Sequence, residues 1–394
     1  MYRKLQDFFL RRRTPALVMF VLASLVATLQ GYYGGTKTFP TQTNDHPYTT
    51  YNNYIIFKQS FFHLVEGHDL YTLYPQEHWD LYKYSPTFAL LFGAFAELPD
   101  FVGLLLWNLI NTLALFLAVR KLPGVSFELK QVVAWFILIE LFTSIQSAQS
   151  NALIAAMIVL ALVLMEDKKF FLACLCIGLT VYIKLFGGLA FALCLLYPQR
   201  WRMAGYAIAV LAGLTLLPLV AIDGHQLTMQ YESWWHLLQQ DFQPNSLSLL
   251  GVVNHWSGRV FPATGVLATG LVLFVLPFLR SSFYSDLRFR LGVLAMILLW
   301  MVVFNHKAES PTFVIAMTGI GIWYVAVPGL TVGRTVLVGL AFVFTSLSPT
   351  DLFPDFIQEN FFEPWSVKAI PCFIIYFILL FEMTFKSPKL FTHE

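Results

Sequence analysis

Long apolar runs separated by short polar segments recur along the chain. Runs such as PALVMFVLASLVATL, FVGLLLWNLINTLALFLAV and ATGLVLFVLPFL approach the roughly 20 apolar residues that a helix needs to cross about 30 Å of hydrocarbon. The pattern predicts an all-α, polytopic membrane protein with about 11–13 transmembrane helices. The candidate spans are residues 15–32, 101–119, 130–147, 151–165, 170–184, 185–198, 203–222, 261–280, 290–305, 312–328, 334–347 and 366–385.

Composition agrees with this pattern. The chain has 394 residues, of which 57% are hydrophobic and 12% charged, whereas soluble domains carry roughly 25% charged residues. We therefore expect residues 1–394 to form a single integral membrane domain. The four cysteines lie within apolar runs, which favours packing roles over a disulfide or a zinc site. Lys and Arg flank the spans without forming a patch, so no nucleic-acid partner is expected.

The positions of the basic residues predict the orientation. The segment YRKLQDFFLRRR precedes the first apolar run, and no small-residue cleavage site follows that run, so a retained first helix with a cytoplasmic anchor is expected. Most of the 25 Lys and Arg residues then fall on the cytoplasmic side. The apolar part of residues 85–100 is too short for a span, and we expect it to be re-entrant or to lie on the surface.

Under this topology the long polar segments gather outside. Residues 33–84 form the first extracytoplasmic loop and residues 223–260 the second. Within these loops, YNNYIIFKQSFFHLV and QYESWWHLLQQ are amphipathic and rich in aromatic residues, which predicts helices at the outer interface. We therefore expect a multi-pass protein of the inner (plasma) membrane with its active site on the extracytoplasmic side.

Two ionisable residues interrupt apolar runs. Lys184 divides CIGLTVYIKLFGGLAFALCLL, which suggests a broken hairpin with the lysine at its outer tip. Either the lysine reaches the membrane surface as a snorkelling side chain, or it contacts a phosphate group. Glu140 either forms a structural hydrogen bond with Asn108 or Asn111 of the preceding span, or belongs to the functional site.

A further polar cluster, NHKAESPT, follows the candidate span 290–305. His306 and Lys307 can both donate hydrogen bonds to phosphate oxygens, so they form a candidate anion site beside Glu309. The alternative is an ordinary solvated loop. No Walker loop, Rossmann glycine pattern, zinc-ligand spacing or DxD motif is evident, so no cofactor is expected. A site outside the cell also lacks cytoplasmic nucleotide donors, which favours a lipid-carried one.

The order of several short motifs resembles a known family. EGHDLYTLYP, YKYSPTFALLF, AQSN, IKLFGG, NSLSLLG and NHKAESPTF, within about residues 45–320, resemble glycosyltransferase family 87. That family contains membrane mannosyltransferases with the C-type fold that use polyprenol-phosphate mannose. The resemblance implies transfer of mannose or another hexose, with inversion and without metal, to a glycan or glycolipid hydroxyl. The implied partners are the lipid-linked sugar, the acceptor and membrane lipids.

The resemblance also implies site residues. Lys184 matches the family's lysine before a helix break, and His306 its late histidine region; with Lys307, these residues are expected to stabilise negative charge on the donor phosphate. Gln149 and Asn151 match a GQxN motif, with Ala148 in place of glycine. The expected substrate-binding residues are Gln149, Asn151, Asn245, Glu140, Glu309 and Tyr84.

The expected general base is the main departure from the family. The position at which the family usually has an acidic residue is occupied here by Asn53. An amide cannot accept a proton from the acceptor hydroxyl. Asp45, beside His46, is the first substitute, so the catalytic candidates are Asp45, Asn53 and His46. Further candidate bases are Asp69, Asp80 and Glu309. The alternative function is a flippase, a transporter or a non-catalytic binder of a lipid-linked sugar.

Overall fold

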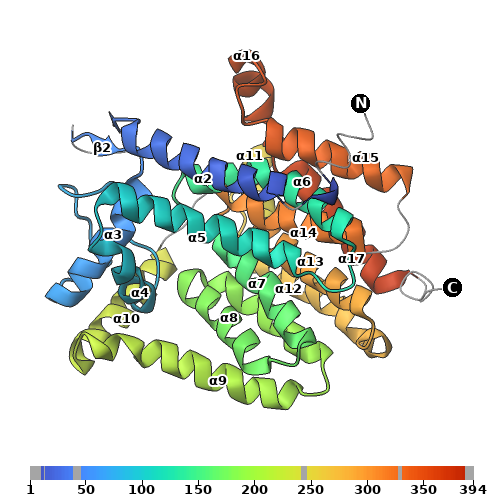
Figure 1. Cartoon of the computed structure of the whole chain (residues 1–394), viewed down its shortest axis with the longest axis horizontal. Coiled ribbons are helices and arrows are strands. Elements are labelled where there is room, and N and C mark those ends of the chain that lie inside the picture. The colour runs from blue at the N-terminus through green and yellow to red at the C-terminus, as the bar shows by residue number, and fades with distance from the viewer. Residues whose placement is uncertain (1–9, 13, 39–45, 241–245, 327–330, 387–394) are drawn as a thin grey trace.

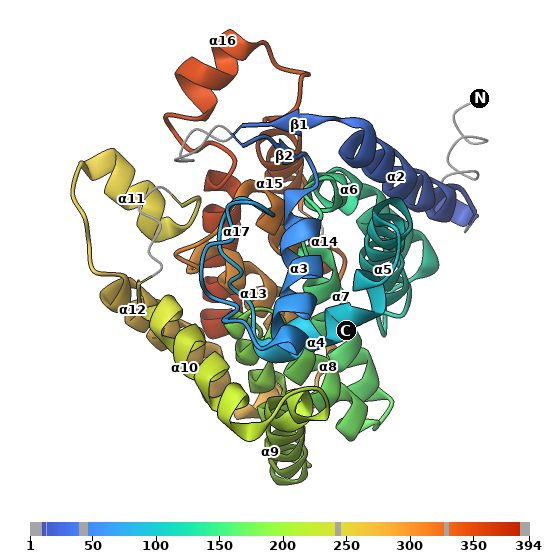
Figure 2. The same ribbon diagram turned by 90° about the vertical axis from the view of Figure 1, so that its left-hand side faces the viewer.

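Helices dominate the computed structural model, which describes residues 10–12, 14–38, 46–240, 246–326 and 331–386 (Figures 1 and 2). Within these ranges the strands are limited to β1 (Thr36–Lys37) and β2 (Tyr48–Thr49), which pair antiparallel with Thr36 opposite Thr49. The predicted all-α class is confirmed.

The α-helices follow one another along the whole described chain. They are α2 (Thr14–Tyr33), α3 (Asn52–Glu66), α4 (Pro86–Ala96), α5 (Asp100–Arg120), α6 (Phe127–Gln146), α7 (Asn151–Glu166), α8 (Phe170–Ile183), α9 (Arg200–Leu216), α10 (Gly224–Gln240), α11 (Leu249–Ser257), α12 (Ala263–Val275), α13 (Leu287–Val303), α14 (Phe313–Ala326), α15 (Val332–Ala341), α16 (Asp355–Ile357) and α17 (Ile370–Phe385).

Shorter 3₁₀ or π segments connect or extend these helices. They are η1 (Leu185–Leu196), η2 (Leu217–Val220), η3 (Leu276–Leu279), η4 (Ser281–Phe283), η5 (Ser310–Thr312), η6 (Phe342–Leu347) and η7 (Gln358–Phe362). The longest of them, η1, follows α8 after a one-residue break, as expected for a broken hairpin.

The apolar helices fall into two length classes. In the described ranges, the helices Thr14–Tyr33, Asp100–Arg120 and Arg200–Val220 are long and apolar enough to cross a membrane, and eight further apolar helices have 10–17 residues. The number of spans therefore stays a prediction. The 11-residue α4 rises about 16 Å, well short of a bilayer, which agrees with its exclusion from the predicted spans.

Helices α13 and α14 form the centre of the protein, where Figure 1 shows them surrounded by other helices. Every residue from Leu291 to Val303 is buried, as expected for a helix that is apolar on all sides. A Cβ at Gly319 would lie 2.9 Å from the carbonyl oxygen of Ala295, so this glycine permits close packing of the two helices. This closely packed pair carries the polar segment 304–312 between its ends.

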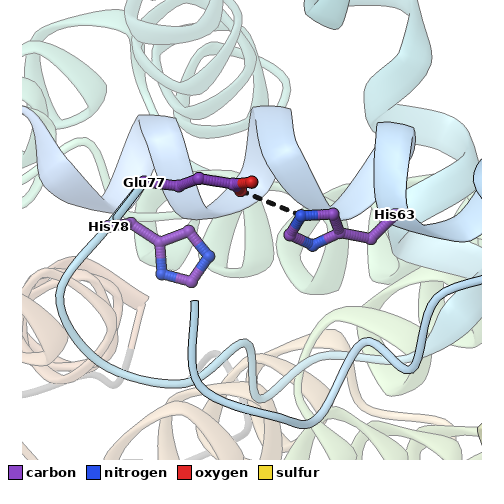
Figure 3. Close-up of side chains that lie close together, drawn as sticks. All are labelled: His63, Glu77 and His78. Atoms are coloured by element: carbon purple, nitrogen blue, oxygen red, sulfur yellow. Dashed lines mark ion pairs between the residues drawn. The ribbon is translucent and has the colours of Figure 1, made fainter. Parts of the chain in front are cut away.

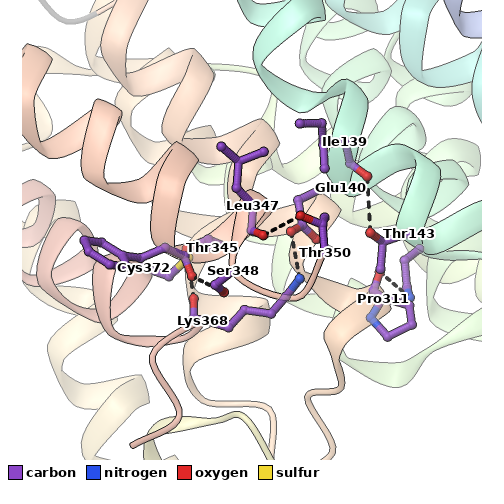
Figure 4. Close-up of polar contacts among 12 residues, drawn as sticks. Ile139, Glu140, Thr143, Pro311, Thr345, Leu347, Ser348, Thr350, Lys368 and Cys372 are labelled. Atoms are coloured by element: carbon purple, nitrogen blue, oxygen red, sulfur yellow. Dashed lines mark hydrogen bonds and ion pairs between the residues drawn. The ribbon is translucent and has the colours of Figure 1, made fainter. Parts of the chain in front are cut away.

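A buried ion pair joins α6 to the segment before α17 (Figure 4). The Nζ atom of Lys368 lies 2.7 Å from Oε1 of Glu140, and both side chains are less than a tenth exposed. The predicted partner of Glu140 is therefore wrong: the amide of Asn108 donates to Thr28, and that of Asn111 to the carbonyl of Trp107. The cation of Lys368 stabilises Oε1 of Glu140 more strongly than a neutral amide would.

We expect Lys368→Met to lower the free energy of unfolding by about 3–5 kcal/mol, because it leaves a carboxylate buried without its cation. The double variant Glu140→Leu/Lys368→Met should recover most of this loss, since it removes both charges. Unfolding of the purified protein in detergent measures the difference. A double variant no more stable than Lys368→Met would contradict this role for the ion pair.

Candidate functional site

A cavity of about 920 Å³ lies at the end of the helix bundle where the predicted polar segments meet. Its walls come from α3, the loop of residues 67–85, the turn between α6 and α7, the break between α8 and η1, α10, and the segment 304–312. The volume is in the range of small-molecule sites, and the walls combine polar groups with apolar side chains.

The Asn52–Asn53 pair fastens α3 to two neighbouring segments. The side chain of Asn52 donates to the carbonyl of Trp79 at 2.7 Å and accepts from the Trp79 amide at 2.9 Å. The side chain of Asn53 donates to the carbonyl of Ser147 at 2.8 Å. Asn53 lines the cavity, and its amide is a hydrogen-bond donor here. Asn52 fixes the backbone of Trp79, next to Asp80.

Asp80 lies on the cavity wall in a constrained conformation. Its φ is 75°, a region that costs a non-glycine residue of order 1–3 kcal/mol. One carboxylate oxygen accepts from the Leu81 amide at 2.8 Å, and the other lies 3.0 Å from Nζ of Lys83. With Trp79 held by Asn52, the carboxylate is fixed at the cavity surface.

The break after α8 places Lys184 at the cavity. Its backbone is extended, at φ −141° and ψ 121°, between α8 and η1. A Cβ at Gly187 would lie 2.2 Å from Oγ1 of Thr180, so glycine is needed for η1 to pack back on α8. The glycine-containing sequence after the lysine therefore allows the chain to reverse and leaves Lys184 at the tip.

A hydrogen-bond chain links three sequence motifs that are distant along the chain. Nζ of Lys184 donates to Oδ1 of Asn151 at 2.7 Å, and the amide of Asn151 donates to Oε1 of Gln149 at 2.8 Å. The amide of Gln149 in turn donates to Oε2 of Glu309 at 3.1 Å. The motifs AQSN, IKLFGG and NHKAESPT thus form one polar wall.

The turn that carries Gln149 contains a backbone position suited to glycine. Ala148 has a φ of 50°, and the indole of Trp107 donates to its carbonyl at 2.8 Å. A left-handed conformation costs an alanine roughly 1–2 kcal/mol, which glycine avoids. Glycine, which the GQxN motif named in the sequence analysis has at this position, would adopt this conformation without that cost.

The segment after α13 brings His306 and Lys307 to the same wall. The side chain of Asn305 accepts from the Lys307 amide at 3.0 Å, and the Asn305 carbonyl accepts from the Ala308 amide at 2.9 Å. Glu309 and Thr312 then form a reciprocal capping box at the start of η5. The tight turn points both basic side chains into the cavity lining.

Tyr84, near the end of the loop of residues 67–85, also lines the cavity. Burial raises the pKa of its phenol well above the ordinary value, and the charge of Glu309 raises it further. The hydroxyl therefore stays protonated at neutral pH and can donate a hydrogen bond to a ligand oxygen.

The structure brings most of the predicted site residues together. Those that line the cavity are Asn53, Tyr84, Gln149, Lys184, His306, Lys307 and Glu309. Asn151 lies directly behind this lining, through its hydrogen bonds with Lys184 and Gln149.

The remaining predicted residues lie elsewhere. Glu140 pairs with Lys368 and is not among the lining residues. The ring of His46 is tilted against that of Tyr48, with ring centroids 4.9 Å apart, and His46 is likewise not in the lining. Asp69 is held in its turn by Ser233, 2.9 Å away. Asp45 and Asn245 lie outside the described residues.

Asn52, Trp79 and Lys83 are among the residues of the site that were not assigned a role from the sequence. Asn52 and Trp79 are 27 residues apart, and only the folded loop brings them into contact. Lys83 follows Asp80 by three residues, a spacing that could have indicated their pairing.

Comparison with known proteins gives one family and a distant structural likeness. The model of glycosyltransferase family 87 matches residues 82–305. Two crystal structures of ArnT from Cupriavidus metallidurans are similar to this chain. The apo form shows 14% identity and a TM-score of 0.48 over 93% of this chain and 77% of ArnT. The form bound to undecaprenyl phosphate shows 13% identity and a TM-score of 0.45 over 95% of this chain and 78% of ArnT. No curated protein sequence matches significantly.

Asn52→Ala should release the loop of residues 67–85, because it removes both hydrogen bonds to Trp79. We expect faster amide exchange at Trp79 and Asp80, measured by hydrogen–deuterium exchange with mass spectrometry. Asn360→Ala is the matched control, since its exposed amide bonds only its own helical turn at Phe356. Unchanged exchange in Asn52→Ala would show that the loop is held by other contacts.

Proposed function

This chain belongs to glycosyltransferase family 87, and on that premise we propose that it transfers mannose or another hexose from a polyprenyl-phosphate donor to an acceptor hydroxyl. The observation that carries the proposal is the convergence of Lys184, His306 and Lys307 on one wall of the cavity. The acceptor is a glycan or glycolipid, and the site faces the extracytoplasmic side of the inner membrane.

The donor phosphate binds at this cationic wall. Cleavage of the sugar–phosphate bond leaves negative charge on the phosphate, which preorganised cations stabilise. The hydrogen bonds described for Lys184 go to the side-chain oxygens of Asn151 and Gln149. Because these amide oxygens are uncharged, they orient the ammonium without neutralising it, and its charge remains available to a phosphate.

The apolar side of the cavity accommodates the lipid. Ile56 and Phe57 of α3 line it together with Leu185, Phe186 and Leu238. These side chains offer apolar contacts to the first isoprene units of a polyprenyl chain. A donor with its phosphate at Lys184 and its chain along this face needs no metal or nucleotide.

Asp80 is our candidate for the general base. The carboxylates among the described lining residues are Asp80 and Glu309. Both accept hydrogen bonds from neighbouring groups, so their positions decide between them. Glu309 belongs to the hydrogen-bond chain that orients Lys184, on the wall proposed to hold the leaving phosphate. Inversion requires the base on the face of the sugar opposite the leaving phosphate. Asp80 comes from the loop of residues 67–85, a separate wall, and fits that requirement better; Asp45 remains its rival.

Asp80→Asn should abolish transfer while preserving donor binding, because the amide keeps the side chain's size but cannot accept a proton. We expect turnover to fall by roughly 10²–10⁴-fold. The measurement is release of polyprenyl phosphate from a polyprenyl-phosphate sugar by purified protein, with donor affinity measured in parallel.

Two variants complete this experiment. Lys184→Ala should instead weaken donor binding by roughly tenfold or more, since it removes a charged hydrogen bond, while Lys169→Ala, in an exposed pair with Asp167, is the matched control. Full activity in Asp80→Asn together with an inactive Asp45→Asn would move the base to Asp45. Donor binding without turnover by the wild type, across a panel of acceptors, would favour a binder or flippase.

A further inference from the structure

Three potential metal ligands meet between α3 and the loop of residues 67–85 (Figure 3). His63 comes from the last turn of α3, whereas Glu77 and His78 come from the loop of residues 67–85. One side-chain ligand atom from each residue lies within 4.8 Å of the other two, and Nε2 of His63 is 2.9 Å from Oε2 of Glu77. None of the three is among the cavity-lining residues.

Each imidazole is oriented by a neighbour. Nδ1 of His78 lies 3.0 Å from the carbonyl oxygen of Asp80. A carbonyl only accepts, so Nδ1 carries the hydrogen, which leaves the lone pair of Nε2 available to a ligand. A metal-binding histidine usually donates the N–H group of its second ring nitrogen to a carbonyl or carboxylate. The ring of His63 stacks on Tyr74 at a centroid distance of 3.7 Å.

The two imidazoles are buried, whereas the carboxylate is partly exposed. His63 and His78 are only 4% and 2% exposed. The side chain of Glu77 is about a third exposed, so it can move and leaves a path from solvent.

We propose that His63, Glu77 and His78 bind one divalent transition-metal ion of the zinc class, with water as the fourth ligand. Bonds of about 2.0–2.1 Å in tetrahedral geometry place ligand atoms about 3.3 Å apart. The present separations, from 2.9 Å to at most 4.8 Å, approach this through side-chain adjustments of about 1.5 Å or less. Two imidazole nitrogens favour Zn²⁺ over Mg²⁺ or Ca²⁺.

The ion would act as a structural fastener. It joins the last turn of α3 to the loop at Glu77 and His78, whereas Asn52 joins the first turn of the same helix to Trp79. The Asp80 carbonyl oxygen is hydrogen-bonded to Nδ1 of His78, so a metal on this histidine also restrains the backbone of Asp80. The site therefore positions a cavity wall, and its existence does not depend on the proposed transferase activity.

Metal binding is tested on the full-length protein in detergent, after removal of any affinity tag and treatment with a chelator. Zn²⁺ is titrated against a chromophoric chelator, and Co²⁺ is added separately to read its absorption bands. We expect one tight equivalent of Zn²⁺, a tetrahedral Co²⁺ spectrum and no competition by Mg²⁺. Zn²⁺ should also raise the thermal unfolding temperature, because it binds the folded state.

Glu77→Gln and His78→Gln are each expected to weaken Zn²⁺ binding by at least about tenfold, because loss of even an outer-shell partner has an effect of that size. Glu66→Gln, which removes an exposed carboxylate 3.6 Å from His68, is the matched control and should bind like the wild type. Comparable unfolding temperatures of the metal-free proteins check that the variants fold. The absence of a saturable equivalent in the wild type, or wild-type affinity in Glu77→Gln, would overturn the proposal.

Discussion

The hydrogen bonds that hold the Lys184 ammonium organise this site. A lysine in an apolar hairpin is costly to bury, so the chain must either expose the charge or surround it with polar atoms. Here the helix ends, the backbone reverses through Gly187, and the ammonium meets the oxygen of Asn151 at 2.7 Å. That contact recruits Gln149 and through it Glu309, so segments far apart in sequence are fixed relative to one charge.

A second wall depends on backbone contacts. The loop of residues 67–85 has no helix or strand, and its position comes from side chains that bond its backbone. Asn52 supplies two of those bonds at Trp79, and His78 supplies one at Asp80. The positive φ of Asp80 is tolerated because the flanking residues are held, and the carboxylate is thereby fixed on the cavity surface. The first wall carries Lys184, His306 and Lys307 together with Glu309, and the second carries Asp80 paired with Lys83.

The sequence predicted features that depend on local pattern. The break at Lys184, the shortness of α4 and helices at α3 and α10 followed from apolar run length and amphipathic periodicity. Partners distant in sequence were not predictable. Glu140 pairs with Lys368, 228 residues away, rather than with the polar residues of its neighbouring helix. Likewise, His63 lies 14 residues before Glu77, so the potential metal ligands have no recognisable spacing.

A structure of the protein with a non-hydrolysable polyprenyl-phosphate sugar would show whether Lys184 binds the donor phosphate and Asp80 faces the reacting carbon. We expect the phosphate within hydrogen-bond distance of Nζ of Lys184, beside His306 and Lys307, with the anomeric carbon between the phosphate and the carboxylate of Asp80. A phosphate bound away from Lys184, or an anomeric carbon that faces away from Asp80, would contradict this expectation.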